Sequence, residues 1–96
     1  MNLESLKSKL ESVKPEIAEK FKVKTIGIFG SYARGEQKKT SDLDVLIDFH
    51  EPISLFKLVE LEDFLSQRLR VKVDLVMRDS LKPRIKENIL NEAIYV

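Results

Sequence analysis

The chain has 96 residues with 17 basic and 16 acidic side chains, one His and no Cys, and its net charge is +1. This length allows one small hydrophobic core, so we expect a single domain over residues 1–96, with a partner chain or a second copy completing any larger active site. The lack of Cys excludes disulfides and thiolate metal sites. The balanced charge argues against nucleic acid as a high-affinity ligand. The charged N-terminal segment and the absence of long apolar runs predict a cytoplasmic protein without membrane contact.

The charges are unevenly distributed along the chain. The net charge is +4 over residues 1–40, −6 over residues 41–63 and +3 over residues 64–96. An acidic segment in the middle of a nearly neutral chain is more typical of a cation site than of a nucleic-acid surface.

Apolar residues at intervals of three and four predict an amphipathic helix over residues 3–21. Because proline removes a helix hydrogen bond, we expect a break near Val13 or Lys14 and a second short helix from Pro15.

Residues 23–29 are rich in β-branched and aromatic side chains and precede Gly30, which predicts a strand stopped by a turn. Gly27, inside this strand, predicts a close approach of another backbone.

The next strand is predicted over residues 42–49, where alternation places Asp42, Asp44 and Asp48 on one face. After Pro52, residues 53–69 have the spacing of a long helix. We expect its apolar stripe to face the core of the domain, although such a stripe can also bind a partner. The stripe consists of Leu55, Leu58, Val59, Phe64 and Leu65.

A third strand is predicted over residues 71–77, with Asp74 pointing away from the face that the neighbouring valines fill. Ser80 is a candidate cap for a last helix that ends at Leu90, with Pro83 in its first turn. Residues 92–96 then form a short edge strand. The alternation of helices and strands predicts an α/β domain.

Two groups of residues have the pattern of a chemical site. Gly30 and Ser31 lie between a strand and a short helical turn, where a close backbone, a hydroxyl and free N–H groups can hold phosphate oxygens. Asp42 and Asp44, spaced by two in a strand, can share a Mg²⁺ ion, and Asp74 can join them if its strand is adjacent. The alternative is that Gly30 only forms a turn, Ser31 only caps a helix and Asp74 is a solvated residue.

These residues resemble the motif of the minimal nucleotidyltransferases, a branch of the polymerase β superfamily. The resemblance rests on the segments FGSYARG (Phe29–Gly35) and SDLDVLIDF (Ser41–Phe49), followed by Asp74 with apolar neighbours, 30 residues after Asp44. It spans residues 26–76, and every motif position matches. The total length also fits this family.

The resemblance implies a polymerase β-like fold of the α/β (α+β) class, with helices packed on a small mixed sheet. It implies that Asp42, Asp44 and Asp74 are catalytic and bind Mg²⁺ or Mn²⁺, with Asp74 acting as a base or second-metal ligand. Gly30, Ser31 and Arg34 would bind the phosphates of ATP. The implied reaction is transfer of AMP to a hydroxyl group, and the implied partner is a HEPN-domain ribonuclease toxin that the protein neutralises as an antitoxin.

Three classes of function remain open from the sequence. The protein is an enzyme that transfers a nucleotide to a protein or RNA, an antitoxin that acts by pairing alone, or a module that binds a nucleotide without turnover. The complete set of glycine, serine and carboxylates favours the enzyme, because a pairing module does not need all of them.

Overall fold

The computed structural model describes residues 2–96, which form a four-stranded sheet with the order β3-β2-β1-β4. The strands are β1 (Val23–Phe29), β2 (Leu43–Phe49), β3 (Val73–Met77) and β4 (Ile94–Tyr95). β2 runs parallel to β3, whereas β1 is antiparallel to both β2 and β4. The sheet is therefore mixed, as the resemblance implied, and the fold class is α+β.

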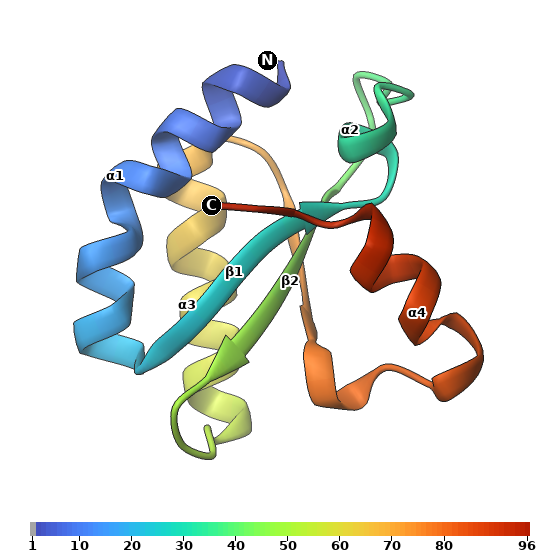
Figure 1. Ribbon diagram of the computed structural model, residues 1–96. Helices are drawn as coiled ribbons and strands as arrows, with labels where there is room; N and C mark the ends of the chain where they lie inside the picture. The colour runs from blue at the N-terminus through green and yellow to red at the C-terminus, as the bar shows by residue number, and fades with distance from the viewer. Residues whose placement is uncertain (1) are drawn as a thin grey trace.

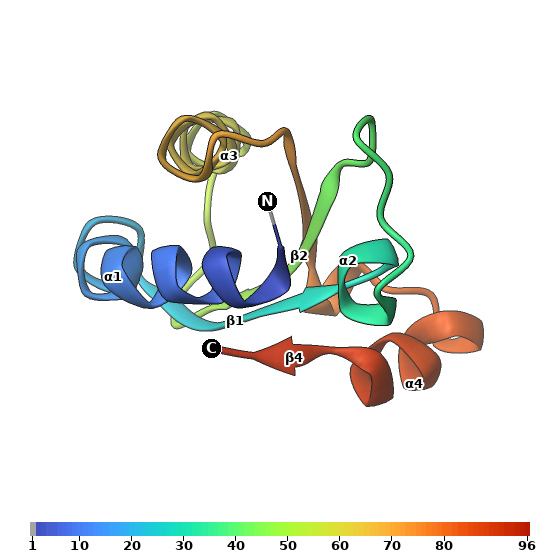
Figure 2. The same ribbon diagram turned by 90° about the horizontal axis from the view of Figure 1, so that it is seen from above.

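The helices are α1 (Leu3–Phe21), α2 (Ser31–Arg34), α3 (Leu55–Leu69) and α4 (Pro83–Glu92), with a short 3-10 turn η1 at Arg78–Ser80. Figure 1 shows α1 and α3 on one side of β1 and β2 and α4 on the other, with α2 just past the end of β1. The view from above in Figure 2 shows the same separation of α4 from α1 and α3. Within residues 2–96, no helix is both long and apolar enough to cross a bilayer.

One hydrophobic core lies between the sheet and the pair of helices α1 and α3. Its members are buried apolar side chains that each element contributes at its own period. They include Leu6, Leu10, Ile17, Ile26, Ile28, Leu43, Val45, Ile47, Leu61, Leu65, Leu69 and Val73. The alternation in β2 is as predicted, because Leu43, Val45 and Ile47 face this core while Asp44 does not.

The predicted break in the first helix is wrong, since α1 continues through Pro15. Pro15 and Glu11 are both exposed, so the Glu11 carbonyl that loses its helix partner at Pro15 can bond to water. Val13 and Ile17, on either side, are buried in the core. Packing of this apolar face therefore holds the helix together despite the missing hydrogen bond.

The predicted orientation of the stripe on α3 is only partly correct. Leu65 is buried, but Leu55 and Val59 are 72% and 50% exposed, and Phe56 is 88% exposed. Each residue advances about 100° around a helix, which places Phe56 directly opposite Leu65 and Val59 well outside the core-facing arc. The sequence pattern combined two faces of the helix, and the start of α3 carries an exposed apolar patch of Leu55, Phe56 and Val59.

The C-terminal segment starts later than predicted. Ser80 belongs to η1 and does not cap α4, which begins at Pro83 without a side-chain cap. Proline sets its own φ and forces Lys82 into an extended conformation, so the helix cannot start before residue 83.

The predicted edge strand is confirmed as β4. The predicted close approach is also confirmed, since a Cβ at Gly27 would lie 3.2 Å from the Ile94 carbonyl oxygen.

Replacement of Pro15 tests how much stability α1 loses at this position. We expect Pro15→Ala to raise the free energy of unfolding by about 1–3 kcal/mol, because it restores the missing hydrogen bond at an exposed site. Urea unfolding, with circular dichroism as a control for unchanged helix content, measures this difference. A fall in stability would show that the proline ring itself stabilises the fold.

Candidate active site

The predicted site residues meet at one end of the sheet. Because β1 is antiparallel to β2 and β2 is parallel to β3, the C-terminal end of β1 lies beside the N-terminal ends of β2 and β3. Gly30 and Ser31 directly follow β1, Asp42 and Asp44 lie at the start of β2, and Asp74 lies near the start of β3. In Figure 1 this end is where α2 follows β1.

Asp44 and Asp74 are direct neighbours across two strands. They are register partners in the parallel pair of β2 and β3. Their adjacent residues Leu43 and Val73 are buried in the core, so alternation directs both aspartates to the opposite face of the sheet. Asp44 is half-buried and Asp74 is exposed, which leaves Asp74 accessible to a second molecule.

The aspartates create an excess of negative charge at Asp44. Burial raises the pKa of the Asp44 carboxyl above its usual range, and the negative charges of Asp74 and Asp42 raise this pKa further. Arg34 acts in the opposite direction and lowers it. The three carboxylates therefore act on one another electrostatically, and together they favour a bound cation.

Gly30 allows β2, the strand that carries Asp44, to pack against the turn after β1. Its φ of 75° and ψ of −152° lie in a region that residues with a side chain rarely adopt. A Cβ at this position would overlap the Asp44 carboxylate. Glycine is thus required at position 30 for two reasons: the backbone conformation is unfavourable for other residues, and the Asp44 carboxylate occupies the space of a side chain.

The short helix α2 holds Ser31 and Arg34 next to Gly30. The Arg34 N–H donates to the Gly30 carbonyl at 3.1 Å, and the Glu36 N–H donates to the Ser31 carbonyl at 2.8 Å. Gly35 ends the helix in a left-handed conformation. The sequence after Gly30 therefore folds back on itself and keeps Ser31 near the carboxylates.

Glu92 is the residue of this site that sequence analysis missed. Its Oε1 atom accepts hydrogen bonds from the Gly30 N–H at 3.1 Å and from Arg34 Nη1 at 2.7 Å. Arg34 also pairs with Glu36 at 3.3 Å, and the hydrogen bonds to Glu36 and Glu92 raise the pKa of Arg34. The sequence feature that could have indicated Glu92 is the predicted strand over residues 92–96. The strand with which this segment pairs decides which residue lies beside Gly30.

Asp42 is positioned by the loop that precedes β2. The Lys38 N–H donates to Ser41 Oγ at 2.9 Å, and the Ser41 N–H donates to the Lys38 carbonyl at 3.0 Å. The Leu43 N–H then donates to the Lys72 carbonyl at 2.8 Å, which ties the start of β2 to the start of β3. Asp42 is exposed between these two anchored points.

The donor atoms at this end of the sheet fit a Mg²⁺ ion that arrives with a triphosphate. Over residues 2–96, no group of three or more His, Cys, Asp or Glu side chains is placed to hold a metal ion by itself. Mg²⁺ is usually held through one or two carboxylates together with substrate phosphates. Asp42 and Asp44 supply such oxygens, and the uncompensated charge at Asp44 favours a cation there.

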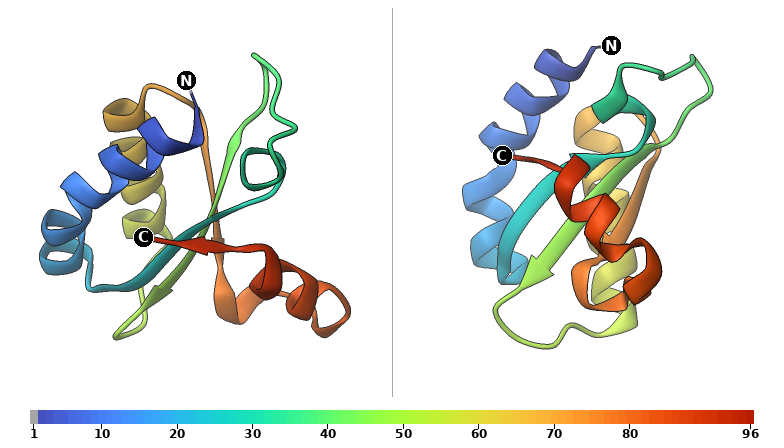
Figure 3. Two further views of the ribbon diagram at one scale, coloured as in Figure 1. Left: turned by 45° about the horizontal axis from the view of Figure 1, so that its top comes forward. Right: turned by 45° about the vertical axis from the view of Figure 1, so that its right-hand side comes forward.

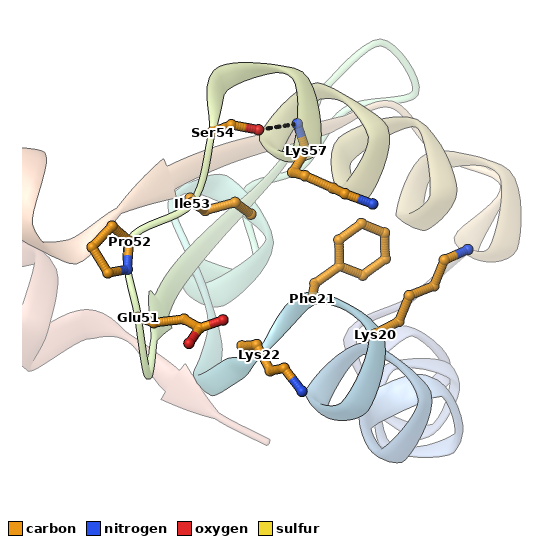
Figure 4. Close-up of a pocket in the computed structure, with 8 residues that line it drawn as sticks. All are labelled: Lys20, Phe21, Lys22, Glu51, Pro52, Ile53, Ser54 and Lys57. Carbon is orange, nitrogen blue, oxygen red and sulfur yellow. Dashed lines mark hydrogen bonds between the residues drawn. The ribbon is translucent and has the colours of Figure 1, made fainter.

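The pocket in Figure 4 is a different feature of the molecule. It has a volume of about 170 Å³ and lies between the end of α1 and the segment that follows β2. Phe21 lies near its centre, with the Lys20 and Lys57 ammonium groups 5.5 Å and 5.9 Å from the ring centroid. This pocket is at the opposite end of β2 from Asp44 and is smaller than typical ligand sites of about 300–1,000 Å³.

Comparison with known proteins gives consistent matches over nearly the whole chain. A family model described as a nucleotidyltransferase domain matches residues 10–96. The chain is 49% identical over 96 residues to protein adenylyltransferase MntA of Thermococcus cleftensis, covering 100% of this chain and 97% of the relative. It is 53% identical over 95 residues to a provisionally named protein adenylyltransferase of Methanocaldococcus jannaschii, covering 98% of this chain and 97% of the relative.

Solved structures give the same result for the fold. A provisionally named minimal nucleotidyltransferase superposes with a TM-score of 0.83 at 38% identity, covering 98% of this chain and 95% of that chain. A toxin–antitoxin structure with AMP-PNP superposes with a TM-score of 0.71 at 24% identity, covering 99% of this chain and 72% of that chain. At this lower identity the likeness shows a shared fold.

Replacement of Gly30 tests its close packing against Asp44. We expect Gly30→Ala to lower the free energy of unfolding by about 2 kcal/mol or more, because the new methyl group strains the backbone and displaces the carboxylate. Gly35→Ala is the matched control, since Gly35 also has a positive φ of 71° but no atoms within 4 Å of a built Cβ. Gly35→Ala should lower the free energy of unfolding by only about 1 kcal/mol, as measured by urea unfolding. Equal losses in both variants would contradict the packing argument.

The raised pKa of Asp44 gives a pH-dependent prediction. The folded state binds the Asp44 proton more tightly than the unfolded state, so the ionised carboxylate lowers stability at neutral pH and this cost disappears as the pH falls below the unfolded value of about 3.9. Asp44→Asn should therefore raise the free energy of unfolding at pH 7 by up to about 1 kcal/mol, with a smaller gain at pH 4. Urea unfolding at both pH values measures the difference, with the exposed Asp63→Asn as control. A loss of stability at pH 7 would contradict this.

Proposed function

The chain belongs to the nucleotidyltransferase domain family, and from this premise we propose that it transfers AMP from ATP to a hydroxyl group of a partner protein. The membership confirms the family resemblance, and the chain is a nucleotidyltransferase. The observation that carries the proposal is the meeting of Gly30, Arg34, Asp44 and Asp74 at one end of the sheet. Two relatives named as protein adenylyltransferases support a protein as acceptor.

The partner that we propose is a HEPN-domain ribonuclease toxin, with this protein as its antitoxin. The similarity to MntA of Thermococcus cleftensis and the fold shared with a toxin–antitoxin structure support this assignment. Asp74 is exposed, so a hydroxyl group on a second chain can approach it.

The triphosphate would bind beside α2. The Ser31 hydroxyl and the N–H groups near Gly30 donate hydrogen bonds to the β- and γ-phosphate oxygens, and Arg34 adds a positive charge. These donors lie next to Asp44, because the Asp44 carboxylate packs against Gly30. Binding of the phosphates at Gly30 therefore brings the α-phosphorus toward the carboxylates.

Asp42 and Asp44 would hold Mg²⁺ or Mn²⁺, with Asp74 as a further ligand where a second ion binds. The ion supplies the positive charge that offsets the like charges of the carboxylates and the phosphates. Without this offset, the excess negative charge at Asp44 would repel a triphosphate. The aspartates thus set both the position of the substrate and its dependence on a divalent cation.

In the proposed reaction, the acceptor hydroxyl attacks the α-phosphorus of ATP. A new oxygen–phosphorus bond forms, the bond between the α-phosphorus and the bridging oxygen to the β-phosphorus breaks, and pyrophosphate leaves with both electrons of that bond. Asp74 accepts the hydroxyl proton as general base. The remaining work is positioning of the two reactants in line, to which Ser31, Arg34 and Asp42 contribute.

Covalent labelling tests the proposed transfer. We expect the protein, incubated with Mg²⁺, its HEPN-domain partner and ATP labelled at the α-phosphate, to attach the label to the partner, and EDTA to abolish the labelling. Asp74→Asn should reduce the labelling rate by about 100-fold or more, because it removes the base. It should still bind ATP in calorimetry, because Ser31, Gly30 and Asp42 are unchanged.

Asp63→Asn is the control variant, since Asp63 is an exposed residue of α3, a helix that packs on the face of the sheet opposite Asp44 and Asp74. It should label the partner at the wild-type rate. If the wild type and an Asp42→Asn, Asp44→Asn double variant neutralise the toxin equally well and no label is transferred, the protein acts by pairing alone and the proposed transfer is wrong.

A further inference from the structure

The Glu92 carboxylate occupies the position that the proposed function assigns to a phosphate. One oxygen atom, Oε1, accepts from both the Gly30 N–H and Arg34 Nη1, at 3.1 Å and 2.7 Å. Carboxylate and phosphate oxygens are both anionic acceptors, and they compete for the same donors. The Glu92 side chain is 25% exposed, so this contact lies at the boundary between protein and solvent.

Strand pairing places Glu92 at this position. β4 is antiparallel to β1, with Gly27 opposite Tyr95 and Ile28 opposite Ile94. In an antiparallel pair, each step forward on one strand is a step back on the other, so the segment just before β4, where α4 ends at Glu92, lies near the turn at Gly30 that follows β1. The pairing of β4 with β1 therefore brings the end of α4 close to Gly30, where the Glu92 side chain makes this contact.

The segment that carries Glu92 is weakly held. α4 contains no buried residue, and β4 is only two residues long. Figure 3 shows α4 projecting from the sheet, while α1 and α3 lie against each other on its other side. Segments with few buried contacts open locally at a low free-energy cost. Glu92 can thus leave Gly30 without disruption of the core.

We propose that Glu92 is an internal competitor of the nucleotide: it holds the Gly30 N–H and Arg34 until triphosphate oxygens replace it, and α4 then moves away from the sheet. The proposal rests on the proposed function, because it takes Gly30 and Arg34 as phosphate donors. A single N–H cannot donate a full hydrogen bond to two anionic oxygens. The negative charge of Glu92 also repels a triphosphate that approaches Gly30 and Arg34. Nucleotide binding and the Glu92 contact therefore exclude each other.

ATP affinity in Glu92 variants tests this competition. We expect Glu92→Ala to bind ATP about fivefold more tightly than the wild type in calorimetry with Mg²⁺, because no internal contact has to be broken. Glu92→Gln should lie between the two, since its amide oxygen still accepts from Gly30 but carries no charge. Glu36→Ala is the matched control: Glu36 contacts Arg34 but not Gly30, so its removal should change the affinity less than twofold.

Amide NMR provides a measurement that does not depend on affinity. The chain has only three glycines, so their signals are readily assigned. Glu92→Ala should shift the Gly30 amide signal without nucleotide and leave Gly35 nearly unchanged. ATP should shift Gly30 and the signals of residues 83–92 in the wild type, and it should leave residues 83–92 nearly unshifted in Glu92→Ala.

The outcomes separate this inference from the function on which it rests. If the wild type binds ATP and Glu92→Ala binds it equally or more weakly, the competition is wrong while the proposed function stands. Unshifted signals for residues 83–92 on ATP binding to the wild type would also overturn the inference. If neither the wild type nor Glu92→Ala binds ATP, both the proposed function and this inference fail.

Discussion

Electrostatic repulsion among neighbouring carboxylates is the constraint around which this end of the molecule is built. The parallel pairing of β2 with β3 places Asp44 beside Asp74, and burial of Asp44 intensifies the effect of each negative charge on it. The fold tolerates this because the core lies on the other face of the sheet, where Leu43 and Val45 pack against helices. Stability and chemistry are thus assigned to opposite faces of the same strand.

Arg34, the cationic group that acts on Asp44, is itself paired with two other carboxylates. Arg34 lowers the pKa of Asp44, but its closest contacts are with Glu92 and Glu36. Arg34 therefore does not offset the whole effect of burial and of the neighbouring carboxylates, and the pKa of Asp44 stays above its ordinary value. A site that neutralised itself would be more stable and would have less affinity for a cation.

Local patterns in the sequence were sufficient for the strands and for most of the site. Alternation in residues 43–49 placed Asp44 opposite the core, and the position of Gly30 after a strand predicted the turn. The errors concern tertiary context. The continuity of α1 through Pro15 depends on packing of its buried face, and the role of Glu92 depends on pairing of β4 with a strand more than 60 residues earlier. Neither the packing nor the register is encoded at short range.

Gly27 links the middle of the sheet to the Glu92 contact at Gly30. It has no side chain, so β4 lies against β1, with the Ile94 carbonyl oxygen 3.2 Å from where a Cβ would be. A side chain at this position would crowd the Ile94 backbone, two residues after Glu92, and would therefore strain the segment that makes the Glu92 contact to Gly30. A purely steric change in the middle of the sheet would then act on the contacts that Glu92 makes with Gly30 and Arg34. Under the proposed function, position 27 would therefore adjust nucleotide affinity without touching the nucleotide.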